Sequence, residues 1–330
     1  MNPFTVSNPT TVADAAATLA KGGAAILAGG TELLSGLKAM NSPATPPATL
    51  VNLKSIPNLS YIKEEGGMLK IGALTTLTTI ATNATVLSGY TALAQAAGAA
   101  ASPELRNQGT IGGNICQKVE CWYFRADDDL FNCLRKDSKG LCYAVTGDNR
   151  YHSIFGGVSG CFAVNPSDTA AALVAFGASI VTNKKTWAVK DFWAVNGENT
   201  TALAADEIVT EIQVPTPAAG TKSAFTKFAL RKAFDFPIVN CAAVITQASG
   251  TVSAAGIALN AVHNLPRKAT EAENSIKGKA INTANADAAG TAAVSTAVAM
   301  PANANTTTIG NKYMIQIAKT LVKRTILLCA

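Results

Sequence analysis

Five of the seven cysteines in this 330-residue chain lie close together: Cys116, Cys121, Cys133, Cys142 and Cys161. Thiols at this density bind a metal ion or an iron–sulfur cluster, or they pair as disulfides. An odd total excludes complete internal pairing, and disulfide-rich scaffolds are usually much shorter. The cysteines therefore favour metal or redox chemistry.

The spacing of these cysteines leaves three kinds of site open. A structural zinc site usually has two short ligand pairs, and only Cys116 with Cys121 has such a spacing. A disulfide would need an oxidising compartment. A [4Fe-4S] cluster needs four thiolates, which a long loop can supply at wide spacings. We leave Cys116 out of a four-cysteine set because it follows a glycine-rich loop by two residues.

Two glycine-rich segments could approach a phosphate. Gly29 and Gly30 stand between an expected strand, residues 25–28, and an expected helix from Thr31, where bare amides would face an anion. Residues 105–114, LRNQGTIGGN, form a second loop whose backbone can approach a ligand closely. The first segment has neither the Walker nor the dinucleotide-binding pattern. A tight turn and a bulged turn remain the structural alternatives.

The elements that must position these groups are predicted as mixed helices and strands. Helices are expected at 14–19, 75–81 and 91–101, strands at 50–53, 68–71, 186–192 and 207–214, and a helix then a strand within 166–181. Asp168 would lie in the first turn of that last helix. The region 115–162 has no clear period.

The segment 216–221 is the clearest linker in the chain. Beyond it, three expected strands, 224–230, 241–247 and 251–259, would make one antiparallel sheet, and residues 268–330 are predicted to be mostly helical. The composition is 48% hydrophobic and 15% charged, which excludes disorder of the whole chain and suits two or three small cores.

The charge pattern predicts an ordinary solvated surface. The net charge is +6, but the basic residues are scattered, so we expect no nucleic-acid partner. No run approaches ~18 apolar residues, and the N-terminus lacks the features of a signal peptide, so we expect no membrane span and no export signal.

Several motifs in order along the chain resemble the FAD-binding (medium) subunit of the xanthine oxidase family of molybdenum hydroxylases. They are ILAGGTELL (26–34), IGALTTL (71–77), LRNQGTIGGN (105–114), PSD (166–168), the LxxxEI pattern (203–208), FTKFALRKAFDFPIV (225–239) and PRKATEAE (266–273). The resemblance covers nearly the whole chain. It implies an α+β protein with an FAD-binding fold of the vanillyl-alcohol-oxidase/p-cresol-methylhydroxylase type. Two FAD-binding subdomains, 1–55 and 56–215, would precede a C-terminal domain, 222–330, with a small antiparallel sheet and helices.

The resemblance also implies which residues contact FAD. The loop around the pyrophosphate would comprise Ala28, Gly29, Gly30, Thr31, Glu32 and Leu33. A second phosphate and ribose contact would come from Thr110, Gly113 and Asn114. Asp168 would bind an adenosine ribose hydroxyl, Leu203 would contact the flavin or adenine, and Lys227 would lie near the isoalloxazine.

An insertion at about 115–162 narrows the resemblance further. ECWYFR, FNCLRK, GLC and SGCFAVNPSD are more similar to the [4Fe-4S] insertion of the bacterial periplasmic aldehyde oxidoreductase branch than to that of 4-hydroxybenzoyl-CoA reductase. By that similarity the cluster ligands are Cys121, Cys133, Cys142 and Cys161. His152, also in the insertion, is expected to be a hydrogen-bonding side chain rather than a ligand.

The function that the resemblance implies is electron transfer within a heterotrimeric oxidoreductase. A large molybdopterin-binding subunit would oxidise an aldehyde, and a small subunit with two [2Fe-2S] clusters would pass the electrons to FAD here and then to an external acceptor. This chain would supply no catalytic residue. The alternatives are a flavin subunit of a 4-hydroxybenzoyl-CoA reductase-like or other molybdenum hydroxylase, and a standalone flavoprotein oxidase or dehydrogenase. The expected compartment is the periplasm, reached with an exported partner, or the cytoplasm.

Overall fold

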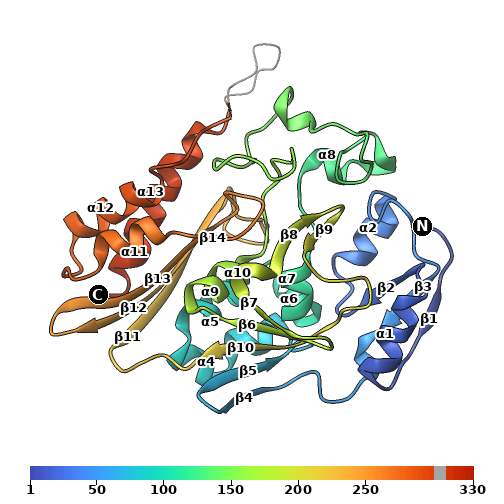
Figure 1. Ribbon diagram of the computed structural model, residues 1–330, viewed down its shortest axis with the longest axis horizontal. Helices are drawn as coiled ribbons and strands as arrows, with labels where there is room; N and C mark the ends of the chain where they lie inside the picture. The colour runs from blue at the N-terminus through green and yellow to red at the C-terminus, as the bar shows by residue number, and fades with distance from the viewer. Residues whose placement is uncertain (301–309) are drawn as a thin grey trace.

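Three larger sheets follow one another along the chain, with a two-stranded fourth sheet, in the computed structural model, which describes residues 1–300 and 310–330 (Figure 1). The first sheet is parallel, in the order β1-β3-β2, and two helices connect its strands. Its elements are β1 (Thr5–Ser7), α1 (Val12–Ala20), β2 (Ala24–Leu27), α2 (Leu33–Ala39) and β3 (Thr49–Asn52), followed by the 3₁₀ helix η1 (Leu53–Ser55). Thr11 begins α1 by accepting a hydrogen bond from the Asp14 amide.

The second sheet is antiparallel, in the order β4-β5-β10-β6-β7. Its strands are β4 (Ile62–Glu65), β5 (Met68–Gly72), β6 (Ser179–Thr182), β7 (Thr186–Ala188) and β10 (Val209–Pro215). Apart from the short helices of the insertion, the helices between β5 and β6 are α3 (Leu77–Thr82), α4 (Ala84–Gly89), α5 (Thr91–Ala99), α6 (Pro103–Gln108), α7 (Ile111–Cys116) and α9 (Asp168–Phe176). A small hairpin, β8 (Trp193–Asn196) and β9 (Asn199–Thr201), follows the short helix α10 (Val189–Phe192).

Two predictions about these elements were wrong in part. The strand predicted at 186–192 ends at Ala188, and α10 follows because its i, i+3 spacing turns Val189 and Phe192 together into the core. The loop predicted at 105–114 contains two short helices, α6 and α7, with Gly109 between them. The other predicted helices and strands are present, with ends shifted by a few residues.

The third sheet confirms the antiparallel sheet predicted after the linker. It has the order β11-β12-β13-β14: β11 (Thr221–Phe228), β12 (Val239–Ala248), β13 (Thr251–Asn260) and β14 (Arg267–Lys268). Helices α11 (Thr270–Ile276) and α13 (Lys312–Leu327) pack against it, and α12 (Thr283–Ala293) packs on these two helices (Figure 1). The part of the helical prediction that covers residues 301–309 lies outside the described residues.

Helix α9 joins the second and third sheets into one packing unit. All nine of its residues are buried, and it contacts β12 and β13 as well as α5. Gly256 in β13 permits this contact, since a Cβ there would lie 2.0 Å from the Ala175 carbonyl oxygen. The main hydrophobic core therefore runs from Leu173 in α9 to Phe225 in β11, across the linker.

The insertion at 115–162 is mostly irregular and crosses the top of the molecule in Figure 1, in green. Its helical segments are α8 (Trp122–Arg125) and the 3₁₀ helices η2 (Asp127–Asp129) and η3 (Tyr143–Val145). It has a small core of its own, in which Phe124 packs with Cys133 and Cys161. The cysteine-rich segment is thus a packed unit rather than a loose loop.

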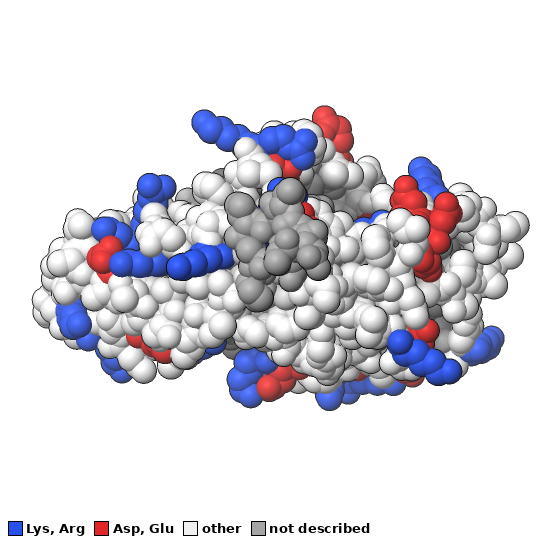
Figure 2. Space-filling view, turned by 90° about the horizontal axis from the view of Figure 1, so that it is seen from above, with Lys and Arg blue, Asp and Glu red and all other residues white. Residues whose placement is uncertain are grey.

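Charged groups of both signs are interspersed on the face shown in Figure 2, and most of that face is uncharged. Within residues 1–300 and 310–330, no helix combines the length and apolarity needed to cross a bilayer.

Candidate functional site

The two glycine-rich segments lie against each other. Gly29 follows β2, and a Cβ on it would stand 2.1 Å from the backbone oxygen of Gln108, at the end of α6. Gly30 has φ +75°, in the left-handed region that glycine tolerates best. Only glycine at position 29 allows this contact, so two segments that are distant in sequence form one surface.

The second glycine segment is connected to the start of α9. Thr110 begins α7, and its Oγ1 accepts a hydrogen bond from the Gly113 amide at 3.1 Å. The Asn114 Oδ1 accepts hydrogen bonds from Ser167 Oγ at 2.7 Å and Thr169 Oγ1 at 2.6 Å. Three predicted FAD-binding segments, around residues 29, 110 and 168, therefore form a single connected region.

Asp168 and Lys227 form an ion pair beside this region. Lys227 Nζ lies 2.7 Å from Asp168 Oδ2, and Asn240 Nδ2 donates to Asp168 Oδ1 at 2.8 Å. Burial raises the pKa of Asp168, and the Lys227 ammonium and the Asn240 amide oppose that shift. The family resemblance predicts that Asp168 and Lys227 contact different parts of FAD, and the structure adds that their side chains pair with each other.

Asn240 was missed by the sequence analysis, because it lies in the apolar run IVNCAAVI of β12. Its side chain is fully buried, and its Oδ1 has no hydrogen-bond partner among the described residues. Burying an amide in an apolar strand is unfavourable unless its polar atoms are satisfied. An asparagine within an apolar run is therefore the one signal in the sequence that could have indicated Asn240.

The remaining predicted FAD contacts occupy different environments. The Ala28 carbonyl accepts a hydrogen bond from Lys54 Nζ at 2.7 Å, which fixes the chain just before Gly29. Leu33 is the first residue of α2, and Leu203 packs against the edge of the main core. Glu32 forms an ion pair with Arg125 of the insertion, and the sequence did not predict this contact.

Arg125 in α8 connects the insertion to the Gly29–Glu32 segment. Its Nη2 lies 2.9 Å from Glu32 Oε1 and 2.8 Å from Glu120 Oε1, and its backbone oxygen accepts from Asn41 Nδ2 at 2.6 Å. Burial raises the pKa of Glu120 to about 7, Arg125 opposes this shift, and Glu32 adds to it. Arg125 and Glu32 are 93 residues apart, so their pairing leaves no local signal in the sequence.

The four predicted cluster ligands come together in the insertion. Cys121, Cys133 and Cys161 pack in its small core, and the Cys142 thiol is close enough to those of Cys133 and Cys161 to interact with them electrostatically. Burial raises the pKa of Cys121 to about 12 and also raises those of Cys133 and Cys142. As free thiols these groups are protonated, and a bound metal would deprotonate them.

Hydrogen-bond donors surround these sulfurs. His152 Nε2 lies 3.3 Å from Cys121 Sγ, and the Ala163 amide donates to Cys161 Sγ at 3.4 Å. Arg135 is almost fully buried, and its Nη1 lies 3.9 Å from Cys161 Sγ. Donors aimed at sulfur stabilise thiolates and set the potential of an iron–sulfur cluster, so this donor set fits a [4Fe-4S] group.

The other two arrangements of the cysteines, a zinc site and disulfides, receive less support. All seven cysteines are among the described residues, and each is a free thiol. In the described part of the chain, no three or more His, Cys, Asp or Glu side chains are grouped so as to hold a metal ion. In a four-iron cluster each thiolate binds a different iron, so its ligands stand further apart than those of one zinc ion. Cys116 lies outside the group and packs against the main core.

Comparison with known proteins identifies the family. Residues 2–217 match the family model described as the FAD binding domain in molybdopterin dehydrogenase, and residues 223–328 match the CO dehydrogenase flavoprotein C-terminal domain. The chain belongs to this family of flavin subunits. It is thus an FAD-binding subunit of the xanthine oxidase family of molybdenum hydroxylases, as the sequence motifs predicted.

Individual relatives cover most of the chain. The aldehyde oxidoreductase FAD-binding subunit PaoB of Escherichia coli is 31% identical over 78% of this chain and 82% of its own length. The carbon monoxide dehydrogenase medium chain of Hydrogenophaga pseudoflava is 29% identical over 88% and 86%. A structure of the latter enzyme superposes with a TM-score of 0.74, 28% identity and coverage of 98% and 96%. The mixed α and β fold predicted from the sequence is confirmed. The bounds of the three predicted domains and the individual site residues stay predictions.

Proposed function

We propose that this chain is the FAD- and [4Fe-4S]-carrying electron-transfer subunit of a three-subunit molybdenum aldehyde oxidoreductase. Aldehyde oxidation would take place on a large molybdopterin-binding subunit, and a small subunit with two [2Fe-2S] clusters would deliver the electrons. Bound FAD accepts electrons and passes them on, here to an external acceptor. The observation that carries the proposal is the four-cysteine insertion that Arg125 attaches to Glu32.

The chain's own residues have binding and positioning roles in this proposal. The Gly29–Glu32 segment and the Thr110–Asn114 segment would enclose the FAD phosphates, since the backbone at Gly29 meets that of Gln108 and Gly109, directly before Thr110. Lys227 and Asn240 would hold the Asp168 carboxylate in place for a ribose hydroxyl. In the insertion, Cys121, Cys133, Cys142 and Cys161 would hold the cluster, and Phe124 and its neighbours would exclude water from it.

The relatives favour aldehyde as the substrate class and leave one other candidate. PaoB belongs to an aldehyde oxidoreductase, and the insertion motifs point to the same branch. The second candidate is the medium chain of another molybdenum hydroxylase, because carbon monoxide dehydrogenase chains superpose over nearly the full length. The compartment, periplasm or cytoplasm, stays a prediction.

Purification of the tagged chain from its native host tests this proposal. We expect two further subunits and molybdenum to copurify, and we expect the complex to reduce a dye with an aldehyde but not with carbon monoxide. Dye reduction with carbon monoxide would support the second candidate instead. A lone chain that oxidises a substrate by itself would contradict both.

A further inference from the structure

Lys54, which fixes the chain before Gly29, is a cation at the edge of the first sheet. The strands β2 and β3 are parallel neighbours with Leu27 opposite Asn52, so both end at the same edge. Ligands of open sheets with parallel strands bind outside the carboxyl ends of those strands. Lys54 follows Asn52 by two residues and therefore lies at the edge from which the predicted pyrophosphate segment begins.

Hydrogen bonds hold both the backbone and the side chain of Lys54 at this edge. The Lys54 amide donates to Asn52 Oδ1 at 3.2 Å, and Asn52 Nδ2 donates to Asn8 Oδ1 at 2.8 Å, just beyond the end of β1. The Lys54 Nζ donates to the Ala28 oxygen at 2.7 Å. The ammonium group is thus fixed beside the first residue of the predicted pyrophosphate segment.

The Lys54 ammonium can still donate to a ligand. It has three N–H donors, and the Ala28 oxygen is the one acceptor that they have within residues 1–300 and 310–330. The residue as a whole is exposed, so a ligand can reach it. Partial burial of the ammonium end lowers the pKa of Lys54, and no carboxylate in the described part of the chain raises it. Lys54 is therefore an accessible cation without a counter-ion.

Carboxylates already hold two other cations of the predicted FAD region. Arg125 is shared by Glu32 and Glu120, and Lys227 is paired with Asp168. The FAD diphosphate carries a negative charge on each phosphate, and Glu32 adds another within the segment that would surround it. Neutral backbone amides cannot balance these charges, so the site needs a further cation.

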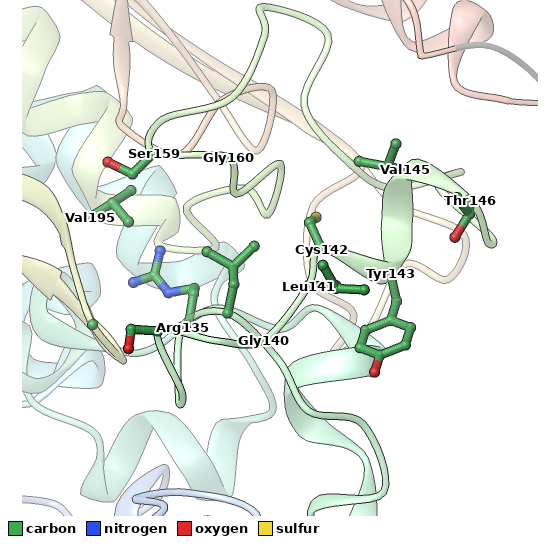
Figure 3. Close-up of a pocket in the computed structure, with 13 residues that line it drawn as sticks. Arg135, Gly140, Leu141, Cys142, Tyr143, Val145, Thr146, Ser159, Gly160 and Val195 are labelled. Carbon is green, nitrogen blue, oxygen red and sulfur yellow. The ribbon is translucent and has the colours of Figure 1, made fainter.

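Two more arginines near the predicted FAD segments are directed elsewhere. Arg106 Nη1 donates to two backbone oxygens that precede α6. Arg135 is buried, and Figure 3 shows its guanidinium directed toward Val195 and Ser159, in a cavity between the insertion and the β8–β9 hairpin. Lys54, in contrast, contacts the pyrophosphate segment itself.

We propose that Lys54 is an FAD-binding residue, whose ammonium donates to a diphosphate oxygen while it holds the Ala28 carbonyl. Charge-assisted hydrogen bonds to phosphate are stronger than those from neutral amides, so Lys54 adds both affinity and charge balance. The inference rests on the FAD-binding part of the proposed function, and it needs neither the cluster nor the electron acceptor.

Titration of FAD into the intact complex, after the bound FAD has been removed, tests this role through flavin fluorescence. We expect Lys54→Met to bind FAD at least roughly tenfold more weakly at low salt, because a hydrogen bond from a charged group is lost. Lys54→Arg keeps the charge and should keep most of the affinity. Lys21→Met, at the exposed end of α1, is the matched control and should bind FAD normally.

The salt dependence separates a contact with phosphate from a role in holding the segment alone. Salt screens an accessible ion pair, so the difference between wild type and Lys54→Met should narrow as KCl rises from about 50 mM to about 500 mM. A difference of the same size at both concentrations would mean that Lys54 acts only through the Ala28 carbonyl, and equal binding would mean that it has no role. Either result overturns the inference and leaves the proposed function intact. A wild-type complex isolated without FAD would instead contradict the proposed function, and this inference with it.

Discussion

At the scale of single residues, the Asp168–Lys227 pair gives the sharpest expectation. Lys227→Met leaves a buried carboxylate without its cation, and we expect a loss of about 3–5 kcal/mol in the free energy of unfolding. Urea unfolding of Lys227→Met, Asp168→Asn and the double variant measures the coupling. The double variant should lose less than the sum of the single losses, and strictly additive losses would contradict a direct pair.

The sequence could predict residue types at this scale but not their partners. Gly29 and the cysteines were predicted from their types and local motifs, and Asp168 from the family resemblance. Arg125 and Asn240 were not, because the first acts through Glu32, 93 residues away, and the second through Asp168, 72 residues away. Contacts between distant positions depend on the packing of whole elements, which no local pattern encodes.

At the scale of elements, the contact between the two glycine segments can be tested directly. Gly29→Ala places a methyl group against the Gln108 carbonyl, so the segments must separate. We expect a loss of about 1–3 kcal/mol in stability and a lower ratio of FAD to protein after gel filtration. Gly89→Ala at the end of α4 is the control, because a Cβ there meets nothing within 4 Å. Full FAD content in Gly29→Ala would argue against a shared FAD surface.

The attachment of the insertion is a second test at this scale. Arg125→Ala leaves Glu32 and Glu120 as partly buried like charges, and we expect a loss of about 2 kcal/mol, less than a fully buried pair costs. Limited proteolysis should then cut the insertion faster, with FAD lost in parallel. Arg150→Ala breaks a more exposed pair in the same insertion and should change stability by at most about 1 kcal/mol. Equal rates of proteolysis in both variants would mean that Arg125 does not attach the insertion to Glu32.

The sequence predicted elements best where their patterns were simple. The strands of the third sheet alternate or run apolar between turns, and all three predicted strands are present. The segment 105–114 was predicted as a loop because its glycines suggest a turn, yet Ser102 and Thr110 begin two short helices there. Side-chain capping by these two hydroxyls outweighed the low helix propensity of glycine.

At the scale of the whole molecule, the linker at 216–221 suggested that the segments on its two sides have separate hydrophobic cores. The structure instead shows a main core that contains residues from both sides of this linker. Alanines and other small residues let α9 lie between two sheets, so the third sheet packs on the segment that carries Asp168. The order of elements was predictable because it follows the order of motifs. The shared core was not predictable from the sequence, because the close packing of α9 on β13 depends on the contact of Gly256 with Ala175. These two residues lie in distant segments of the chain.

The central claim is that this flavin subunit carries its own cluster, and an iron count tests it most directly. In the intact complex we expect about eight irons per FAD, four from this chain and four from two [2Fe-2S] clusters of the small subunit. Complexes with Cys133→Ser should lose about four irons, whereas Cys116→Ser, outside the cysteine group, should keep them all. About four irons per FAD in the wild type, unchanged by Cys133→Ser, would contradict the account.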